Sequence, residues 1–280
     1  MPAHRPTLAT DLDTLLRSTA DRRRMLHWLM ASAATPLAAC GGGAEVSIGG
    51  VGTSTGSSEG SSTVSSCSII PEETAGPYPG DGSNYNSNGI ANALSLSGIV
   101  RSDIRNSVAG ASGTAAGIPL TLTLQLVNTA GSCANLAGYA IYLWHCTRDG
   151  LYSMYSTGVT AENFLRGVQQ TDSNGKATFL TIFPGCYAGR MPHMHFEVYP
   201  SLASATGAAN KVKTSQIAFP TTTCNDVYAT SGYGNSAINL AAISFASDNV
   251  FSDGTEQQMA SISGTTTNGY SASLVVGIAS

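Results

Sequence analysis

Short runs of β-favouring residues recur between turn sequences from residue 67 onward, and they limit what this chain can fold into. The runs occupy residues 120–127, 139–145, 177–182, 194–199 and 271–278. They are rich in Thr, Val, Ile, Leu and aromatic residues, which suit a pleated, half-buried surface. The turns at residues 147–150 and 172–175 end in glycine, which accepts a positive φ. The pattern predicts an all-β fold, a β-sandwich with long irregular loops.

Residues 1–39 have the pattern of an export signal. Arg22, Arg23 and Arg24 precede a weakly apolar run from Met25 to Ala39, too short for a helix to span the roughly 30 Å hydrocarbon layer. A basic segment, an apolar segment and small residues at its end are typical of a secretory signal peptide, and the paired arginines resemble a twin-arginine signal.

The signal ends in the sequence LAAC, whose cysteine is Cys40. It resembles a bacterial lipobox, so we expect Cys40 to be lipidated and the protein to be an exported, membrane-anchored lipoprotein facing the periplasm or the cell exterior. The alternative is an ordinary signal peptide with a chance cysteine. Residues 40–66 are mostly Gly and Ser and predict a flexible tether.

Residues 67–280 are long enough for one domain with a sizeable core. The formal net charge of the chain is −4 and basic residues do not cluster after the signal. We therefore expect no nucleic-acid partner and membrane contact through the lipid anchor only. The oligomeric state stays open.

The predicted domain contains five cysteines: Cys67, Cys133, Cys146, Cys186 and Cys224. None form a C-x-x-C pair, which argues against a thiolate zinc site. Export permits disulfides, but an odd number leaves at least one thiol unpaired. The sequence does not choose among the possible pairings.

Two of the few histidines, His193 and His195, form an H-x-H pair in a predicted strand. Residues i and i+2 of a strand share a face, about 7 Å apart along the chain, so two imidazoles can converge on one metal ion. The pair alone fits a hydrogen-bonded core equally well. The cupin fold uses such a pair with a further histidine downstream, and none follows His195.

Two tyrosines at turns lie upstream of this pair. Tyr152 follows the turn at residues 147–150, and Tyr187 follows Pro184-Gly-Cys. A phenolate is a hard anionic ligand suited to ferric iron. Tyr155 is a rival for Tyr152, and each tyrosine taken singly also fits a packing role.

Five segments occur in an order that carries a resemblance. They read WHCTRDGLYS (144–153), FLRG (164–167), TD (171–172), TIFPGCY (181–187) and RMPHMHF (190–196), with PEETAGPY (71–78) before them and TSQI (214–217) after them. Together they resemble the intradiol ring-cleavage dioxygenases, relatives of protocatechuate 3,4-dioxygenase and catechol 1,2-dioxygenase. The resemblance covers roughly residues 67–220.

The resemblance implies an Fe³⁺ site with Tyr152, Tyr187, His193 and His195 as ligands. It implies that Tyr187 is the ligand that leaves when substrate binds and that it can take a substrate proton.

Arg190 matches a family arginine that stabilises negative charge on the substrate, and Gln216 matches a glutamine beside the site. Gly76 and Pro77 match a segment that lines the substrate pocket. Only five residues separate Tyr187 from His193, fewer than in the well-known enzymes. The short connection predicts a more open site and resembles an exported bacterial subgroup.

The implied activity is cleavage of a catechol-type aromatic ring between its two hydroxylated carbons with O₂, giving a muconate-type diacid. Two alternatives remain. One is a non-catalytic cell-surface β-sandwich binding module, since the TD…PG-x-Y pattern also occurs in such modules. The other is an iron-binding relative without turnover.

Overall fold

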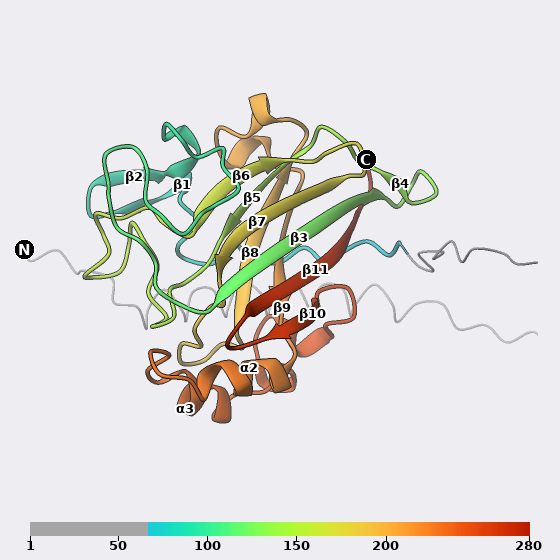
Figure 1. Ribbon diagram of the computed structural model, residues 1–280. Helices are drawn as coiled ribbons and strands as arrows, with labels where there is room; N and C mark the ends of the chain where they lie inside the picture. The colour runs from blue at the N-terminus through green and yellow to red at the C-terminus, as the bar shows by residue number, and fades with distance from the viewer. Residues whose placement is uncertain (1–66) are drawn as a thin grey trace, which may run out of the picture. The chain divides into compact units, whose positions relative to one another are not determined.

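A computed structural model describes residues 67–280. The predicted signal peptide, the lipidation of Cys40 and the tether at residues 40–66 lie outside the described residues. The sequence from residue 67 folds as the predicted sandwich of two β-sheets (Figure 1).

The first sheet is built around β3 (Pro119–Asn128). This strand pairs in parallel with β11 (Gly269–Ile278) on one side and antiparallel with β7 (Lys176–Ile182) on the other. The short β4 (Ala134–Asn135) also pairs with β3, and β10 (Ser261–Thr265) extends the sheet beyond β11. Leu residues of β3 alternate with Thr and Gln, so one face of the strand is apolar.

The second sheet has the strand order β6–β5–β8–β9 and is antiparallel throughout. Its strands are β5 (Ala140–Trp144), β6 (Arg166–Gln170), β8 (His193–Tyr199) and β9 (Lys213–Ala218). Five of the strands, β3, β5, β7, β8 and β11, correspond to the five runs predicted from the sequence.

The main core lies between the two sheets. Leu122 and Leu124 of the first sheet belong to the same buried cluster as Leu143, Met194 and Phe196 of the second, and all five side chains are fully buried. Burial of each such side chain contributes about 1.5–3 kcal/mol to folding.

The opposite face of the second sheet is also covered. Tyr142, Trp144 and Tyr199 form a second buried cluster with Leu94. The cover comes from residues 75–80 and from the hairpin of β1 (Asp81–Asn86) and β2 (Gly89–Asn92), which lies beside β6 and β5 in Figure 1. Every residue of β5 and β8 is therefore buried.

Arg166 links the covering residues 78–80 to the second sheet through hydrogen bonds. Its guanidinium donates hydrogen bonds to the carbonyls of Tyr78 at 2.9 Å, Pro79 at 2.7 Å and Ser153 at 3.0 Å, and to the Tyr142 hydroxyl at 3.1 Å. The side chain is 1% exposed. Because a buried cation needs all its donors occupied, these bonds fix the course of residues 78–80 over the sheet.

Two helices, α2 (Thr221–Tyr228) and α3 (Ser236–Ala241), lie together at one end of the sandwich (Figure 1). Short 3₁₀ helices occupy Ala93–Ser95, Leu202–Ser204, Ala208–Asn210, Phe245–Ser247 and Phe251–Asp253. Within residues 67–280, no helix combines the length and apolar character needed to cross a bilayer.

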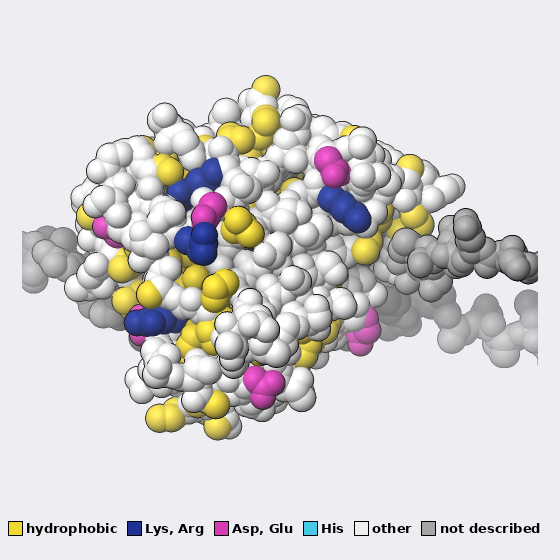
Figure 2. Space-filling view, viewed as in Figure 1, with side chains coloured by type: hydrophobic (Ala, Val, Ile, Leu, Met, Phe, Trp, Pro, Cys, Tyr) yellow, Lys and Arg dark blue, Asp and Glu magenta, His cyan; other side chains and the backbone are white. Residues whose placement is uncertain are grey.

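Figure 2 shows that Lys and Arg side chains are few and spread over the visible face, several of them beside Asp or Glu. Arg105 and Asp103, for example, form an ion pair of 2.7 Å. His145, His193 and His195 are all buried, so the histidines of the domain belong to its interior.

Cys67 and Cys133 form a disulfide with a Cα–Cα distance of 5.6 Å. Cys146, Cys186 and Cys224 are buried free thiols in the described part of the chain. The structure thereby chooses one pairing that the sequence left open. The bridge ties the start of the domain to the turn that follows β3.

We predict that replacing both bridged cysteines, Cys67→Ser with Cys133→Ser, lowers the free energy of unfolding by about 2–4 kcal/mol. The bridge joins residues 66 positions apart, so its loss releases chain entropy in the unfolded state. Denaturant unfolding measures the change. A reducing agent should lower wild-type stability to the level of the variant and leave the variant unaffected; equal stability of wild type and variant would contradict the prediction.

Candidate metal centre

The register of β8 puts His193 and His195 on the face turned away from the main core. His195 lies opposite Trp144 of β5 and Gln216 of β9. Its ring stacks on the Trp144 indole, with a centroid distance of 5.0 Å and an interplanar angle of 6°. Strand alternation and this stacking fix the direction of the imidazole.

Two loops bring the tyrosines to the same face. Tyr152 lies in the loop between β5 and β6, and Tyr187 lies in the loop between β7 and β8. The loops pack closely because Gly150 has a φ of +81° and a Cβ there would lie 3.0 Å from the Tyr187 Cβ. A side chain at Gly185 would overlap the Arg148 carbonyl. Glycine at these two positions lets the tyrosine-bearing loops touch.

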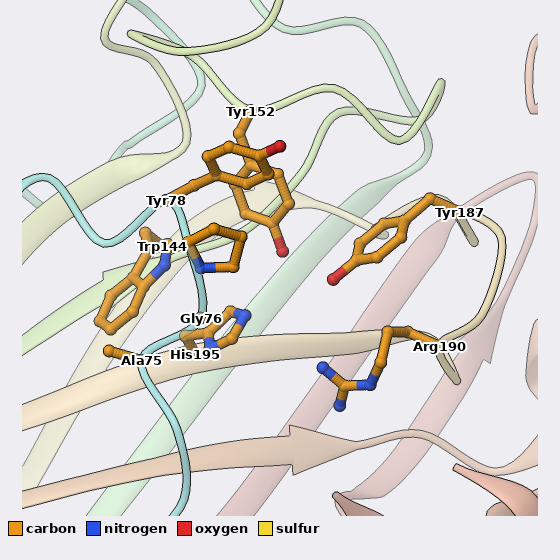
Figure 3. Close-up of a pocket in the computed structure, with 9 residues that line it drawn as sticks. Ala75, Gly76, Tyr78, Trp144, Tyr152, Tyr187, Arg190 and His195 are labelled. Carbon is orange, nitrogen blue, oxygen red and sulfur yellow. The ribbon is translucent and has the colours of Figure 1, made fainter. Parts of the chain in front are cut away.

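The four side chains converge. The Tyr187 Oη lies 3.1 Å from the His193 Nε2, which lies 3.1 Å from the His195 Nε2. The Tyr152 ring meets the Tyr187 and His195 rings edge-on, at centroid distances of 6.0 and 6.3 Å. Figure 3 shows the hydroxyls of Tyr152 and Tyr187 directed into the space that they share with His195.

The donor atoms suit a metal ion. The His193 Nδ1 lies 2.6 Å from the Met191 carbonyl, so Nδ1 carries the proton and Nε2 presents a lone pair. Two nitrogens bound at about 2.0–2.1 Å to one ion at right angles lie about 3 Å apart. The Tyr152 Oη is buried and makes no hydrogen bond of regular geometry among residues 67–280, although the Tyr187 hydroxyl lies near enough to interact with it. Such an arrangement is costly for a neutral phenol.

Burial keeps the four groups neutral when no cation is present. Desolvation lowers the pKa of His193 and of His195 well below the usual value. Desolvation also raises the pKa of Tyr152 and of Tyr187, although the charge of Arg190 partly opposes this for Tyr187. A bound cation would lower the pKa of the two tyrosines instead, because its charge stabilises phenolate oxygens.

Arg190 and Gln216 are joined beside the histidines. The Arg190 Nη2 donates to the Gln216 Oε1 at 2.7 Å, and the Gln216 Nε2 donates to the Thr74 carbonyl at 2.9 Å. The Arg190 Nε forms an ion pair of 3.0 Å with Asp248. Sequence reasoning missed Asp248, because no local motif surrounds it.

A small cavity of about 20 Å³ opens over His195. Its lining consists of Ala75, Gly76, Pro77, Tyr78, Trp144, Tyr152, Tyr187, Arg190 and His195 (Figure 3). Gly76 has a φ of +68°, and a Cβ there would lie 3.4 Å from the His195 Cε1. The cover segment therefore runs close to His195, and the two residues expected to line a pocket do so.

Tyr155 and His145, the other tyrosine and histidine considered as metal ligands, have hydrogen-bond partners of their own. The Tyr155 hydroxyl donates to Asn84 at 2.6 Å and accepts from the Gly80 amide at 2.8 Å, so it holds the cover. The His145 nitrogens lie 2.8 Å from the Cys146 carbonyl and 2.6 Å from the Thr181 hydroxyl. Within residues 67–280, no group of three or more His, Cys, Asp or Glu side chains is arranged to hold a metal ion.

Comparisons with known proteins assign this fold and sequence to a class. A family model described as dioxygenase matches residues 100–217. An intradiol ring-cleavage dioxygenase from Tetranychus urticae shares 26% identity and a TM-score of 0.57, over 76% of this chain and 95% of that chain. A second dioxygenase crystal structure shares 25% identity and a TM-score of 0.58 over the same 76% and 95%. No curated protein matches the sequence.

The β-sandwich and the family match thus define a dioxygenase-type fold. More narrowly, the chain is similar in sequence and fold to the intradiol ring-cleavage dioxygenases, and the resemblance predicted from the ordered motifs is confirmed. Its link to an exported bacterial subgroup, and the ligand roles of Tyr152, Tyr187, His193 and His195, stay predictions.

We predict that Tyr152→Phe has opposite effects on stability and on iron binding. Without metal, removal of this buried hydroxyl, which makes no hydrogen bond of regular geometry, should raise the free energy of unfolding by about 1 kcal/mol, while the iron content after reconstitution should fall. Unfolding in the presence of a chelator and metal analysis measure the two effects.

Tyr142→Phe is the matched control. The Tyr142 hydroxyl donates to the Pro79 carbonyl at 2.8 Å and accepts from Arg166, so its loss should destabilise the protein by about 1–3 kcal/mol. If Tyr152→Phe destabilised the metal-free protein as much as Tyr142→Phe, the Tyr152 hydroxyl would be an ordinary structural group.

Proposed function

We propose that this protein is an Fe³⁺-dependent intradiol dioxygenase. It uses O₂ to cleave a catechol-type ring between the two hydroxylated carbons and releases a muconate-type diacid. The observation that carries the proposal is the convergence of the buried Tyr152 phenol, the half-buried Tyr187 phenol and two neutral imidazoles from β8, with an arginine beside them.

The donor set supports ferric iron. Phenolates are hard, anionic oxygen ligands, and two of them with two neutral imidazoles leave Fe³⁺ a net charge of +1. When bound, the iron would supply Lewis-acid activation and a template that brings catechol and O₂ together. Tyr152, Tyr187, His193 and His195 would hold it.

The two tyrosines are proposed to act differently. The Tyr152 side chain is in the buried core, whereas Tyr187 is half-buried in a loop with exposed neighbours. Because Tyr187 is the more exposed of the two, we assign it the role of the ligand that substrate displaces and that accepts a substrate proton at its Oη.

Arg190 and Gln216 are proposed to serve the substrate. Arg190 lines the cavity, and its Nη2 donates a hydrogen bond to the Gln216 Oε1. A fixed cation there stabilises negative charge that develops on the ring oxygens. Gly76 and Pro77 form the wall over His195, where they would contact the ring and exclude water.

We also propose, from the sequence alone, that the enzyme acts outside the cytoplasm. The arginine-containing signal at residues 1–39, the lipobox ending at Cys40 and the Gly/Ser tether up to residue 66 support an exported lipoprotein whose domain stands off the membrane. A catechol-type aromatic compound and O₂ would then reach it from the periplasm or the cell exterior.

We predict O₂ uptake when the iron-loaded protein is given catechol, with one O₂ consumed for each ring cleaved. His193→Ala should lower kcat/KM at least a hundredfold, because it removes an iron ligand. An oxygen electrode and absorption of the diacid product measure both. Iron binding without O₂ uptake across a panel of catechols would indicate a relative without turnover; failure to bind iron at all would favour a binding module.

We predict that the iron-loaded protein is coloured by phenolate-to-iron charge transfer and that Tyr187→Phe shifts its visible absorption band. Tyr155→Phe is the matched control, since Tyr155 bonds Asn84 and Gly80 and does not line the cavity. Its spectrum should equal that of the wild type. A band unchanged by Tyr187→Phe would remove Tyr187 from the ligand set.

A further inference from the structure

Asp248 is a buried carboxylate that the predicted chemistry leaves unused. It follows the 3₁₀ helix Phe245–Ser247, in the segment between α3 and β10, and its side chain is 0% exposed. This segment lies beyond residues 100–217, the part that the dioxygenase family model matches. Its position nevertheless brings it against the candidate site.

Both oxygens of Asp248 are filled by hydrogen-bond donors. One oxygen accepts from the Met191 amide at 2.6 Å and from the Arg190 Nε at 3.0 Å. The other accepts from the amides of Val250 at 2.8 Å and Phe251 at 3.1 Å, with the Arg190 Nε at 3.2 Å. Each of these contacts is made by an N–H donor, so Asp248 acts as the acceptor in all of them.

These bonds hold Arg190 in one orientation. Asp248 takes the Nε, Gln216 takes the Nη2, and the guanidinium carbon lies 5.8 Å from the centre of the Phe251 ring. A long side chain at a pocket edge otherwise samples many rotamers. Asp248 therefore decides where the cation points.

The same carboxylate supports a histidine. The Met191 amide donates to Asp248, and the Met191 carbonyl accepts from the His193 Nδ1 at 2.6 Å. A single residue thus links the carboxylate to the bond that fixes the tautomer of His193. Groups that hydrogen-bond to a metal-binding side chain, as the Met191 carbonyl does to His193, fix the orientation of that side chain.

Asp248 also sets the charge of the cavity. Arg190 is the one Lys or Arg among the described residues that line it, and that cation is paired. Arg166 approaches from behind the wall, but its donors are engaged by Tyr78, Pro79 and Ser153. The cavity thus offers no unpaired cation, from the described part of the chain, to a carboxylate on the substrate ring.

We propose that Asp248 is a positioning residue for Arg190 and His193 and that, by pairing Arg190, it makes the site select uncharged catechols over carboxylated ones. The inference rests on the proposed catechol-cleaving function and names its substrate class. A carboxylate bound next to a paired arginine faces Asp248 without gaining a free partner, and a like charge in a partly buried site disfavours binding.

Asp248→Asn tests the assignment, because it removes the charge and keeps the shape. Catechol and 3,4-dihydroxybenzoate are titrated into iron-loaded protein without O₂, and the visible absorption reports binding. We expect the wild type to bind catechol at least tenfold more tightly than 3,4-dihydroxybenzoate. In Asp248→Asn the ratio of the two affinities should fall about tenfold. Asp226→Asn, at an exposed position of α2 that does not line the cavity, is the control and should keep the wild-type ratio.

Arg190→Gln is a second, independent test. It is needed because the amide group of Asp248→Asn would face N–H donors, and that variant can fail to fold. With Arg190 gone, Asp248 is unpaired, and the preference for catechol should rise about tenfold. The proposal would be overturned if the wild type bound both compounds with equal affinity. It would also be overturned if the variants bound both compounds more weakly without changing the ratio of the two affinities.

Calorimetry with the same two rings gives the affinity ratio for iron-free protein as well. Failure to bind iron would therefore count against the proposed function alone, and the ratio would still decide the role of Asp248. Thermal unfolding of each variant reports any loss of structure separately from the change in preference.

Discussion

The burial of the second sheet on both faces is the constraint on which the site depends. Along β8, alternation sends Met194 and Phe196 into the core between the sheets and sends His193 and His195 to the other face. That second face is covered by residues 75–80 and the β1–β2 hairpin, which Arg166 fastens. The histidines therefore lie in a dry layer, where imidazoles stay neutral and keep lone pairs for a ligand.

A dry layer rich in polar groups is stable only if each group finds a partner. Most of them do: His193 bonds the Met191 carbonyl, and Gln216 bonds both Arg190 and Thr74. The Tyr152 hydroxyl, the Trp144 Nε1 and the His195 Nδ1 are exceptions among the described residues, because they make no hydrogen bond of regular geometry. The Tyr152 hydroxyl is a costly polar atom at the place where a cation would compensate for it, which is common where function overrides stability.

The C-terminal segment completes the site from outside residues 100–217, the part that the dioxygenase family model matches. Asp248 reaches Arg190 and the Met191 amide from the far end of the chain. This contact joins the electrostatics of the cavity to the geometry of the metal-binding strand. The charge that the substrate meets is therefore a property of Arg190 and Asp248 together.

Local patterns determined much of this protein: runs of β-favouring residues between turns predicted five of the strands, and H-x-H in a strand predicted two histidines on one face. The ordered motifs determined the relationship to the intradiol dioxygenases. Helix α2 was not predicted, because its Thr-rich sequence has low helix propensity and forms by burying Cys224 and Val227. Tertiary structure alone decided the Cys67–Cys133 pairing and the partnership of Asp248 with Arg190, because contacts between residues far apart in the chain leave no periodic signal in it.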